Sequence, residues 1–82
     1  MQEPTLILFV RFRTAPPGPL ALHDQLVGSY CGWVMSRVDA LRSPGEYLVS
    51  LVGGALPDQW VTADVMQRVL GDRAHVSVRG VR

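Results

Sequence analysis

The stretch from Leu20 to Leu41 constrains the fold most, because it is the only segment long enough to form a helix of many turns. With 3.6 residues per turn, its apolar side chains gather on roughly half of the circumference. The members of this apolar face are Leu22, Leu26, Val27, Cys31, Trp33, Val34, Val38 and Leu41. This pattern predicts one long amphipathic helix, with shorter strands and a second helix arranged around it.

Two glycines, Gly28 and Gly32, fall on the opposite, polar side of this predicted helix. Glycine in a helix costs roughly 1 kcal/mol relative to alanine, so a close approach of another backbone is one reason for the pair. Simple tolerance of two exposed glycines is the alternative. We expect a second chain to approach at this ridge. We also expect Trp33 and Trp60, each beside an apolar helical stripe, to anchor the core or an interface.

His23, Tyr30 and Arg37 are spaced seven residues apart along the same stretch. On a helix they would span about 21 Å, which is too far for all three to contact one small ligand. They could instead line an extended interface, to which Tyr30 and Arg37 would contribute. Alternatively, His23 reaches water, Tyr30 packs with its hydroxyl at the rim, and Arg37 extends its charge to the surface.

Three segments have the composition of strands. The run from Thr5 to Arg13 begins with continuous apolar residues, which is typical of a central strand covered on both faces. Glu46 to Val52 is rich in β-branched and aromatic residues, and Ala74 to Val81 alternates as an edge strand does. A second helix is expected to begin at Asp58 or Thr62 and to end at Gly71. Its predicted buried stripe is Val61, Val65 and Val69, with Met66 and Leu70 beside them.

The resulting order of strand, helix, strand, helix, strand favours right-handed crossovers within one sheet. The sequence therefore predicts a single small α/β domain over residues 1–82, β-α-β-α-β, with a mostly parallel three-stranded sheet and two helices. A ferredoxin-like α+β sandwich is the alternative, with a fourth strand from Ala55 to Val61. Pro57 makes that segment a poor inner strand.

A group of arginines is the main candidate for ligand binding. Open parallel sheets bind ligands beyond the carboxyl ends of their strands, where Arg11, Arg13 and Arg79 would lie, with His75 as the nearby proton carrier. Gly53-Gly54 follows the second strand and precedes a helix, so its backbone amides could face an anion. The alternative is that these residues are solvated strand ends, since the chain has no phosphate-binding loop motif.

Other chemistries are poorly supported. No cofactor is predicted, and the spacing of His23, His75 and Cys31 does not suit a metal site. The net charge of +1 gives no bulk attraction to nucleic acid or to an anionic membrane. No segment reads as a secretion signal or a membrane span, and the single cysteine cannot form an internal disulfide, so we expect a cytoplasmic protein. Its basic residues are all arginine, which indicates a bacterial-like, GC-rich coding bias.

The charged residues amount to only 18% of the chain, below the usual ~25%, so a small domain of this kind has difficulty hiding its apolar surface. We therefore expect a non-enzymatic protein-interaction or regulatory module, a subunit of a homo- or hetero-oligomer whose partner is a second copy or a larger complex. The alternative is a small enzyme or sensor that binds an anionic ligand at the arginine cluster.

Overall fold

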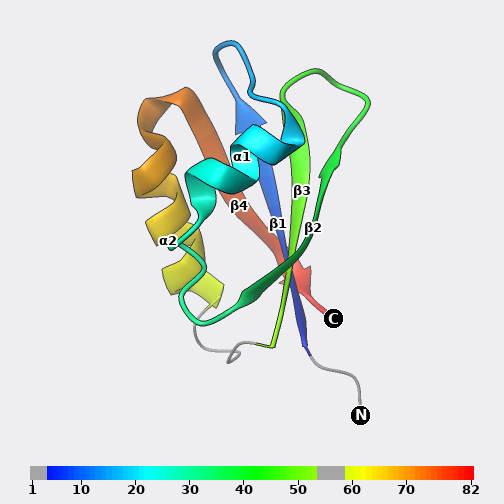
Figure 1. The fold of residues 1–82 in the computed structure, drawn as a ribbon, viewed down its shortest axis with the longest axis vertical. Helices are drawn as coiled ribbons and strands as arrows, with labels where there is room; N and C mark the ends of the chain where they lie inside the picture. Colours follow the sequence, from blue (N-terminus) through cyan, green and yellow to red (C-terminus); the bar gives the residue numbers. More distant parts are fainter. Residues whose placement is uncertain (1–3, 54–58) are drawn as a thin grey trace.

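A computed structural model describes residues 4–53 and 59–82, which form one β-sheet and two α-helices. The strands run antiparallel, and both helices lie on one side of the sheet (Figure 1). The elements are β1 (Thr5–Phe12), α1 (Pro19–Leu26), β2 (Val34–Ala40), β3 (Glu46–Val52), α2 (Gln59–Leu70), a 3-10 turn (Gly71–Arg73) and β4 (Ala74–Val81).

The predicted fold class is wrong, because the sheet has four strands in the order β2-β3-β1-β4 and every neighbouring pair is antiparallel. The βαββαβ element order with this strand order has the topology of the ferredoxin-like sandwich that was the alternative. Its extra strand is β2, whereas the alternative placed that strand at Ala55 to Val61. Residues 55–58 lie outside the described part of the chain, and residues 59–61 begin α2.

The predicted long helix is also wrong, because α1 ends at Leu26, after eight residues. Gly28 and Gly32 have φ angles of 90° and 88°, and Cys31 between them has a φ of 52°. A right-handed helix cannot contain such angles, which only glycine adopts without strain. The two glycines thus turn the chain out of the helix and into β2, although the apolar spacing on either side of them mimics one helical face.

A tight hairpin turn joins β2 to β3. Gly45 has a φ of 84°, and the Leu41 amide donates a hydrogen bond to the Glu46 carbonyl over 2.9 Å. The Ser43-Pro44-Gly45 sequence, which follows the segment predicted as a long helix, therefore supplies the turn between two antiparallel strands. β2 consequently lies at the edge of the sheet beside β3 (Figure 1).

The hydrophobic core lies between the helices and one face of the sheet. Alternate residues of the two central strands point into it: Leu6, Leu8, Val10 and Phe12 from β1, and Tyr47, Val49 and Leu51 from β3. The helices contribute Leu22, Leu26, Met66 and Leu70, and Trp33 packs in from the turn before β2. The predicted central position of β1 and edge position of β4 are both confirmed.

The predicted buried stripe of the second helix is confirmed for Met66 and Leu70 and wrong for the three valines. Val61 and Val69 are exposed, and Val65 is half-buried, whereas Thr62, Ala63, Met66 and Leu70 face the core. Trp60 is exposed as well, at 62%, so it does not anchor the core of this chain. The helical period was correct, but the sheet covers the adjacent side of the helix.

Candidate interaction surface on the open face of the sheet

The face of the sheet opposite the helices carries apolar side chains that are only half-buried. Ile7 and Phe9 of β1 and Leu48 of β3 lie there, together with Ser50 of β3. Strand pairing aligns Asp39, Leu48, Phe9 and Ser77 in one row and Arg37, Ser50, Ile7 and Gly80 in the next. No element within residues 4–53 and 59–82 covers this surface, which we call the open face.

Two β-bulges place arginines on the open face. One interrupts the β2–β3 register between Met35 and Arg37, and the other interrupts the β1–β4 register between Ile7 and Leu8. A bulge inserts an extra residue and re-aims the side chains beside it. Because of the first, Arg37 rather than Ser36 pairs opposite Ser50. At the second, Val78 pairs with Leu8 and Gly80 pairs with Ile7, so Arg79 is the extra residue between them. Both edge strands therefore present a guanidinium at the same level of the sheet.

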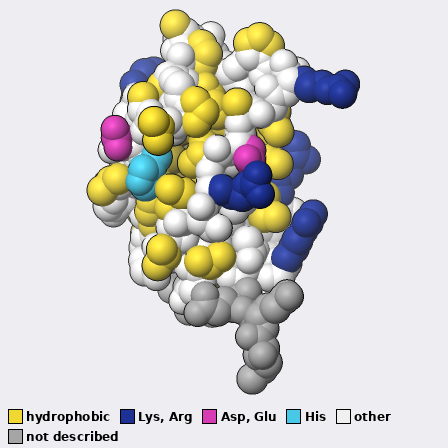
Figure 2. Space-filling view, turned by 45° about the vertical axis from the view of Figure 1, so that its right-hand side comes forward, with side chains coloured by type: hydrophobic (Ala, Val, Ile, Leu, Met, Phe, Trp, Pro, Cys, Tyr) yellow, Lys and Arg dark blue, Asp and Glu magenta, His cyan; other side chains and the backbone are white. Residues whose placement is uncertain are grey.

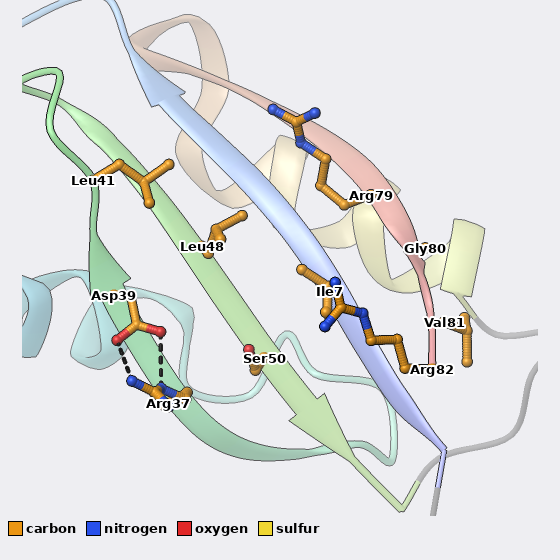
Figure 3. A pocket seen from close by; sticks show the side chains of 10 residues that line it. All are labelled: Ile7, Arg37, Asp39, Leu41, Leu48, Ser50, Arg79, Gly80, Val81 and Arg82. Carbon is orange, nitrogen blue, oxygen red and sulfur yellow. Dashed lines mark hydrogen bonds and ion pairs between the residues drawn. The ribbon is translucent and has the colours of Figure 1, made fainter.

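These side chains line a shallow depression of about 640 Å³ (Figure 3). Its floor is apolar, formed by Ile7, Leu48 and Leu41, and the Ser50 hydroxyl lies among them. Arginines from both edges surround the floor: Arg37 from β2, and Arg79 and Arg82 from β4 and the residue after it. The surface is broad and shallow, which suits contact with another macromolecule better than enclosure of a small ligand.

The charges of the open face are mostly positive. Arg37 makes a two-pronged contact with Asp39, with N···O distances of 2.8 and 2.9 Å, and Arg11 lies 3.7 Å from Glu46. The Arg79 guanidinium lies 4.6 Å from the centre of the Phe9 ring. Figure 2 shows basic side chains gathered on one side of the molecule, beside hydrophobic ones and with few acidic ones. The open face thus combines an apolar centre with charged edges.

The antiparallel sheet divides the predicted arginine cluster into two parts. Arg11 pairs opposite His75, and these two residues line a depression of about 580 Å³ with Arg13 and Phe12. Arg79 lies toward the other end of the sheet, because the end of β4 runs beside the start of β1. Carboxyl ends of all strands meet at one edge only in a parallel sheet, so the predicted single site does not form.

The predicted glycine pair of the anion site is separated from Arg11 and Arg13 as well. Gly53 donates a backbone hydrogen bond to Pro4, at the end of the sheet where β1 begins. Gly54 lies outside the described residues. The structure therefore supports a basic cluster of Arg11, Arg13 and His75 without the glycines.

The residues predicted for an interface on the long helix have different positions. Gly28 and Gly32 form no ridge, because both lie in the turn between α1 and β2. Trp33 and Tyr30 are buried in the core, whereas Arg37 faces the opposite side of the sheet. Four of the predicted interface residues are exposed in this chain, namely Gly28, Gly32, Arg37 and Trp60.

The turn brings His23 and Tyr30 together. The His23 Nδ1 lies 2.9 Å from the Tyr30 hydroxyl, and the two rings stack with an interplanar angle of 8°. This polar contact does not include Arg37, which lies on the opposite side of the sheet. Burial raises the pKa of the Tyr30 hydroxyl above its ordinary value of 10.0, because the surroundings disfavour the charged phenolate.

This buried hydroxyl predicts a loss of stability in alkaline solution. The pKa of Tyr30 is therefore higher in the folded chain than in the unfolded chain. Neutral Tyr30 contributes fully to the free energy of unfolding at a pH below the pKa of the unfolded chain, and this contribution is lost as the pH rises through the pKa of the folded chain. We expect Tyr30→Phe to lower the free energy of unfolding by about 1 kcal/mol at neutral pH, through the lost hydrogen bond. Above about pH 10 it should lose less additional stability than the parent chain. Urea unfolding across this range measures both effects, and parallel curves would contradict the prediction.

Several residues of the open face were not predicted as site residues, namely Ile7, Phe9, Leu48, Ser50, Asp39 and Arg82. For Ile7 and Phe9 a signal was present, since they share a face with Arg11 in a regular strand. An apolar run that ends in alternating arginines is compatible with a strand whose second face is open. For Asp39 the sequence carries no such signal, because the apolar spacing around it is that of a helix.

Neither a known protein-family model nor a curated protein matches this sequence. The described helices are too short and too polar for either to cross a bilayer. Within the described part of the chain, no three His, Cys, Asp or Glu side chains come together as a metal site would require. The open face and the basic cluster are therefore the two features of the described residues that point to a function.

Proposed function

We propose that this chain is a non-enzymatic protein-interaction module that works as a subunit of an oligomer and docks through the open face of its sheet. The observation that carries the proposal is the half-buried apolar centre of that face, formed by Ile7, Phe9 and Leu48. Antiparallel sheets often leave one face to water, but such a face is then typically polar. An apolar face therefore favours a partner.

The free-energy gain from covering this centre supports the proposal. Burial of apolar surface contributes about 25 cal/mol for each Å² removed from water. Branched and aromatic side chains at the middle of an interface, with charged groups at its edge, are the usual arrangement in protein complexes. Here Ile7, Phe9 and Leu48 hold the centre, while Arg37 and Arg79 hold the edges.

Anion binding is the second candidate, and the observation that favours it is the depression lined by Arg11, Arg13 and His75. Arginine guanidinium groups bind carboxylates and phosphates through charge-assisted hydrogen bonds. The Glu46 carboxylate lies 3.7 Å from the Arg11 Nε and partly neutralises the charge of this arginine, which weakens the case for anion binding. The site is also open to solvent, where screening reduces such interactions.

Light scattering over a dilution series tests the proposal. We expect the mass of the chain to rise from that of a monomer to that of an oligomer as the concentration increases, with the transition in the micromolar range or below for an interface of ordinary size. In a monomer the apolar centre of the open face would stay in contact with water, which is unfavourable in free energy. A strict monomer at every concentration, whose His75 resonances shift when inorganic phosphate is added, would reject the module and favour the anion site.

A further inference from the structure

The charges around the open face indicate the chemistry of its partner. Resting on the proposed function, we infer that this face binds an acidic segment of another protein. The apolar side chains of that segment enter the depression, and its carboxylates lie over the β4 edge. Three features of the molecule support such a partner: the distribution of charge, two arginines without a carboxylate partner, and the aliphatic floor of the depression.

Positive charge gathers on the open face although the net charge of the chain is only +1. The arginines of this face outnumber its carboxylates: they are Arg11, Arg37, Arg79 and Arg82, against Asp39 and Glu46. The other carboxylates of the described residues lie on the helix side, namely Asp24 on α1, Asp64 on α2 and Asp72 in the 3-10 turn. The open face therefore attracts negative charge, which the net charge of the whole chain does not reveal.

The two edges of the face differ in charge. Both carboxylates are already engaged, because Asp39 pairs with Arg37 on β2 and Glu46 lies beside Arg11. Within the described residues, neither Arg79 nor Arg82 forms an ion pair with a carboxylate. The β4 edge therefore keeps two free positive charges, whereas the Arg37–Asp39 pair leaves the β2 edge neutral.

The free arginines have the geometry to bind carboxylates. The Arg79 guanidinium lies over the Phe9 ring, 4.6 Å from its centre. Its five N–H donors point outward in the plane of the guanidinium, so Arg79 can bind a carboxylate and still contact the ring. An arginine binds a carboxylate through two parallel charge-assisted hydrogen bonds. The carboxylates of the partner are therefore expected over β4.

The floor of the depression favours a protein over a nucleic acid. Ile7, Leu41 and Leu48 make this floor aliphatic (Figure 3). Single-stranded nucleic acid stacks its bases on aromatic rings. On the described part of the open face Phe9 is the one aromatic side chain, and Arg79 already covers its ring. A bilayer would meet the arginines of the rim before it reached the floor, whereas a single apolar side chain of a protein fits between them.

A second copy of this chain suits the open face less well. Its own open face has the same excess of arginines, so like charges would meet around the two apolar centres. Salt screens this repulsion and should strengthen the association of the chain with itself, whereas salt should weaken the binding of an acidic segment. The two occupants therefore respond to salt in opposite directions.

The test titrates the full chain into a fluorescently labelled peptide of about seven residues, which matches the length of the strands when extended. The peptide has leucines at its centre and two glutamates at each end. Fluorescence anisotropy should show saturable binding that weakens by about tenfold or more between about 0.05 and 0.5 M salt. A peptide with lysine in place of glutamate, and one with glycine in place of leucine, should each bind at least about tenfold more weakly.

Three charge reversals assign the site on the chain. Arg79→Glu and Arg82→Glu should each raise the dissociation constant of the acidic peptide by about tenfold. Arg68→Glu on α2 is the matched control, since Arg68 is also exposed and its reversal changes the net charge equally. We expect this control to bind within about two-fold of the parent chain. Circular dichroism verifies that the three variants keep the fold.

The outcomes separate this inference from the proposed function. Equal losses in Arg68→Glu and Arg79→Glu, or tighter binding of a ten-nucleotide oligothymidine than of the acidic peptide, overturn the inference. A chain that associates with itself but does not bind the acidic peptide also overturns it and leaves the proposed function standing. A chain that stays monomeric at every concentration and binds none of these probes overturns both.

Discussion

Replacing Leu8 by alanine should lower the free energy of unfolding by about 3 kcal/mol, within the range of 2–5 kcal/mol found for large-to-small changes in protein cores. Leu8 lies on the central strand β1 and is fully buried between its neighbours and the helices. Its removal leaves a cavity that a close-packed sheet cannot collapse to fill. Total stability in such domains is typically about 5–15 kcal/mol, so the loss is large.

Urea unfolding at one fixed protein concentration measures this loss, because association would otherwise change the apparent stability. Val69→Ala is the matched control, since Val69 is an exposed apolar residue on α2. We expect this control to change the free energy by less than about 1 kcal/mol. Equal losses for the two variants would contradict the placement of the core on the helix side of β1.

Alanine at Gly28 and Gly32 should destabilise the chain, by about 1–2 kcal/mol at each position, because an L-residue is strained at positive φ. Both glycines have φ angles near 90°, and a Cβ atom at either position would meet no other atom within 4 Å. The penalty therefore comes from the backbone alone. In a continuous helix from Leu20 to Leu41 the same substitutions would instead stabilise, by about 1 kcal/mol each.

The sign of this effect thus distinguishes a turn from a helix. Thermal or urea unfolding of the double variant gives the largest signal, and the two losses should approximately add. Gly18→Ala is the control, because Gly18 has a φ of −69° and also has open space around it. We expect this control to stay within about 0.5 kcal/mol of the parent chain. A more stable Gly28→Ala/Gly32→Ala variant would exclude the turn.

The candidate site was predictable only in part. The sequence placed Arg11, Arg13 and His75 near one another, and strand pairing brings Arg11 and His75 together. It also indicated that apolar surface would remain for a partner. It did not identify Asp39 or Arg79 as neighbours of that surface, because both depend on bulges and on a fourth strand that periodicity did not reveal.

Local composition determined most elements of this protein. The apolar run of β1, the β-branched residues of β3, the alternation in β4 and the period of α2 each specify a conformation through side chains close in sequence. Only the tertiary structure decided the conformation of residues 27–40, because the apolar spacing of this segment fits a helix as well as it fits a turn followed by a strand. Backbone angles at the glycines and pairing with β3 favour the strand. That fourth strand makes the sheet antiparallel and divides the arginines between two sites.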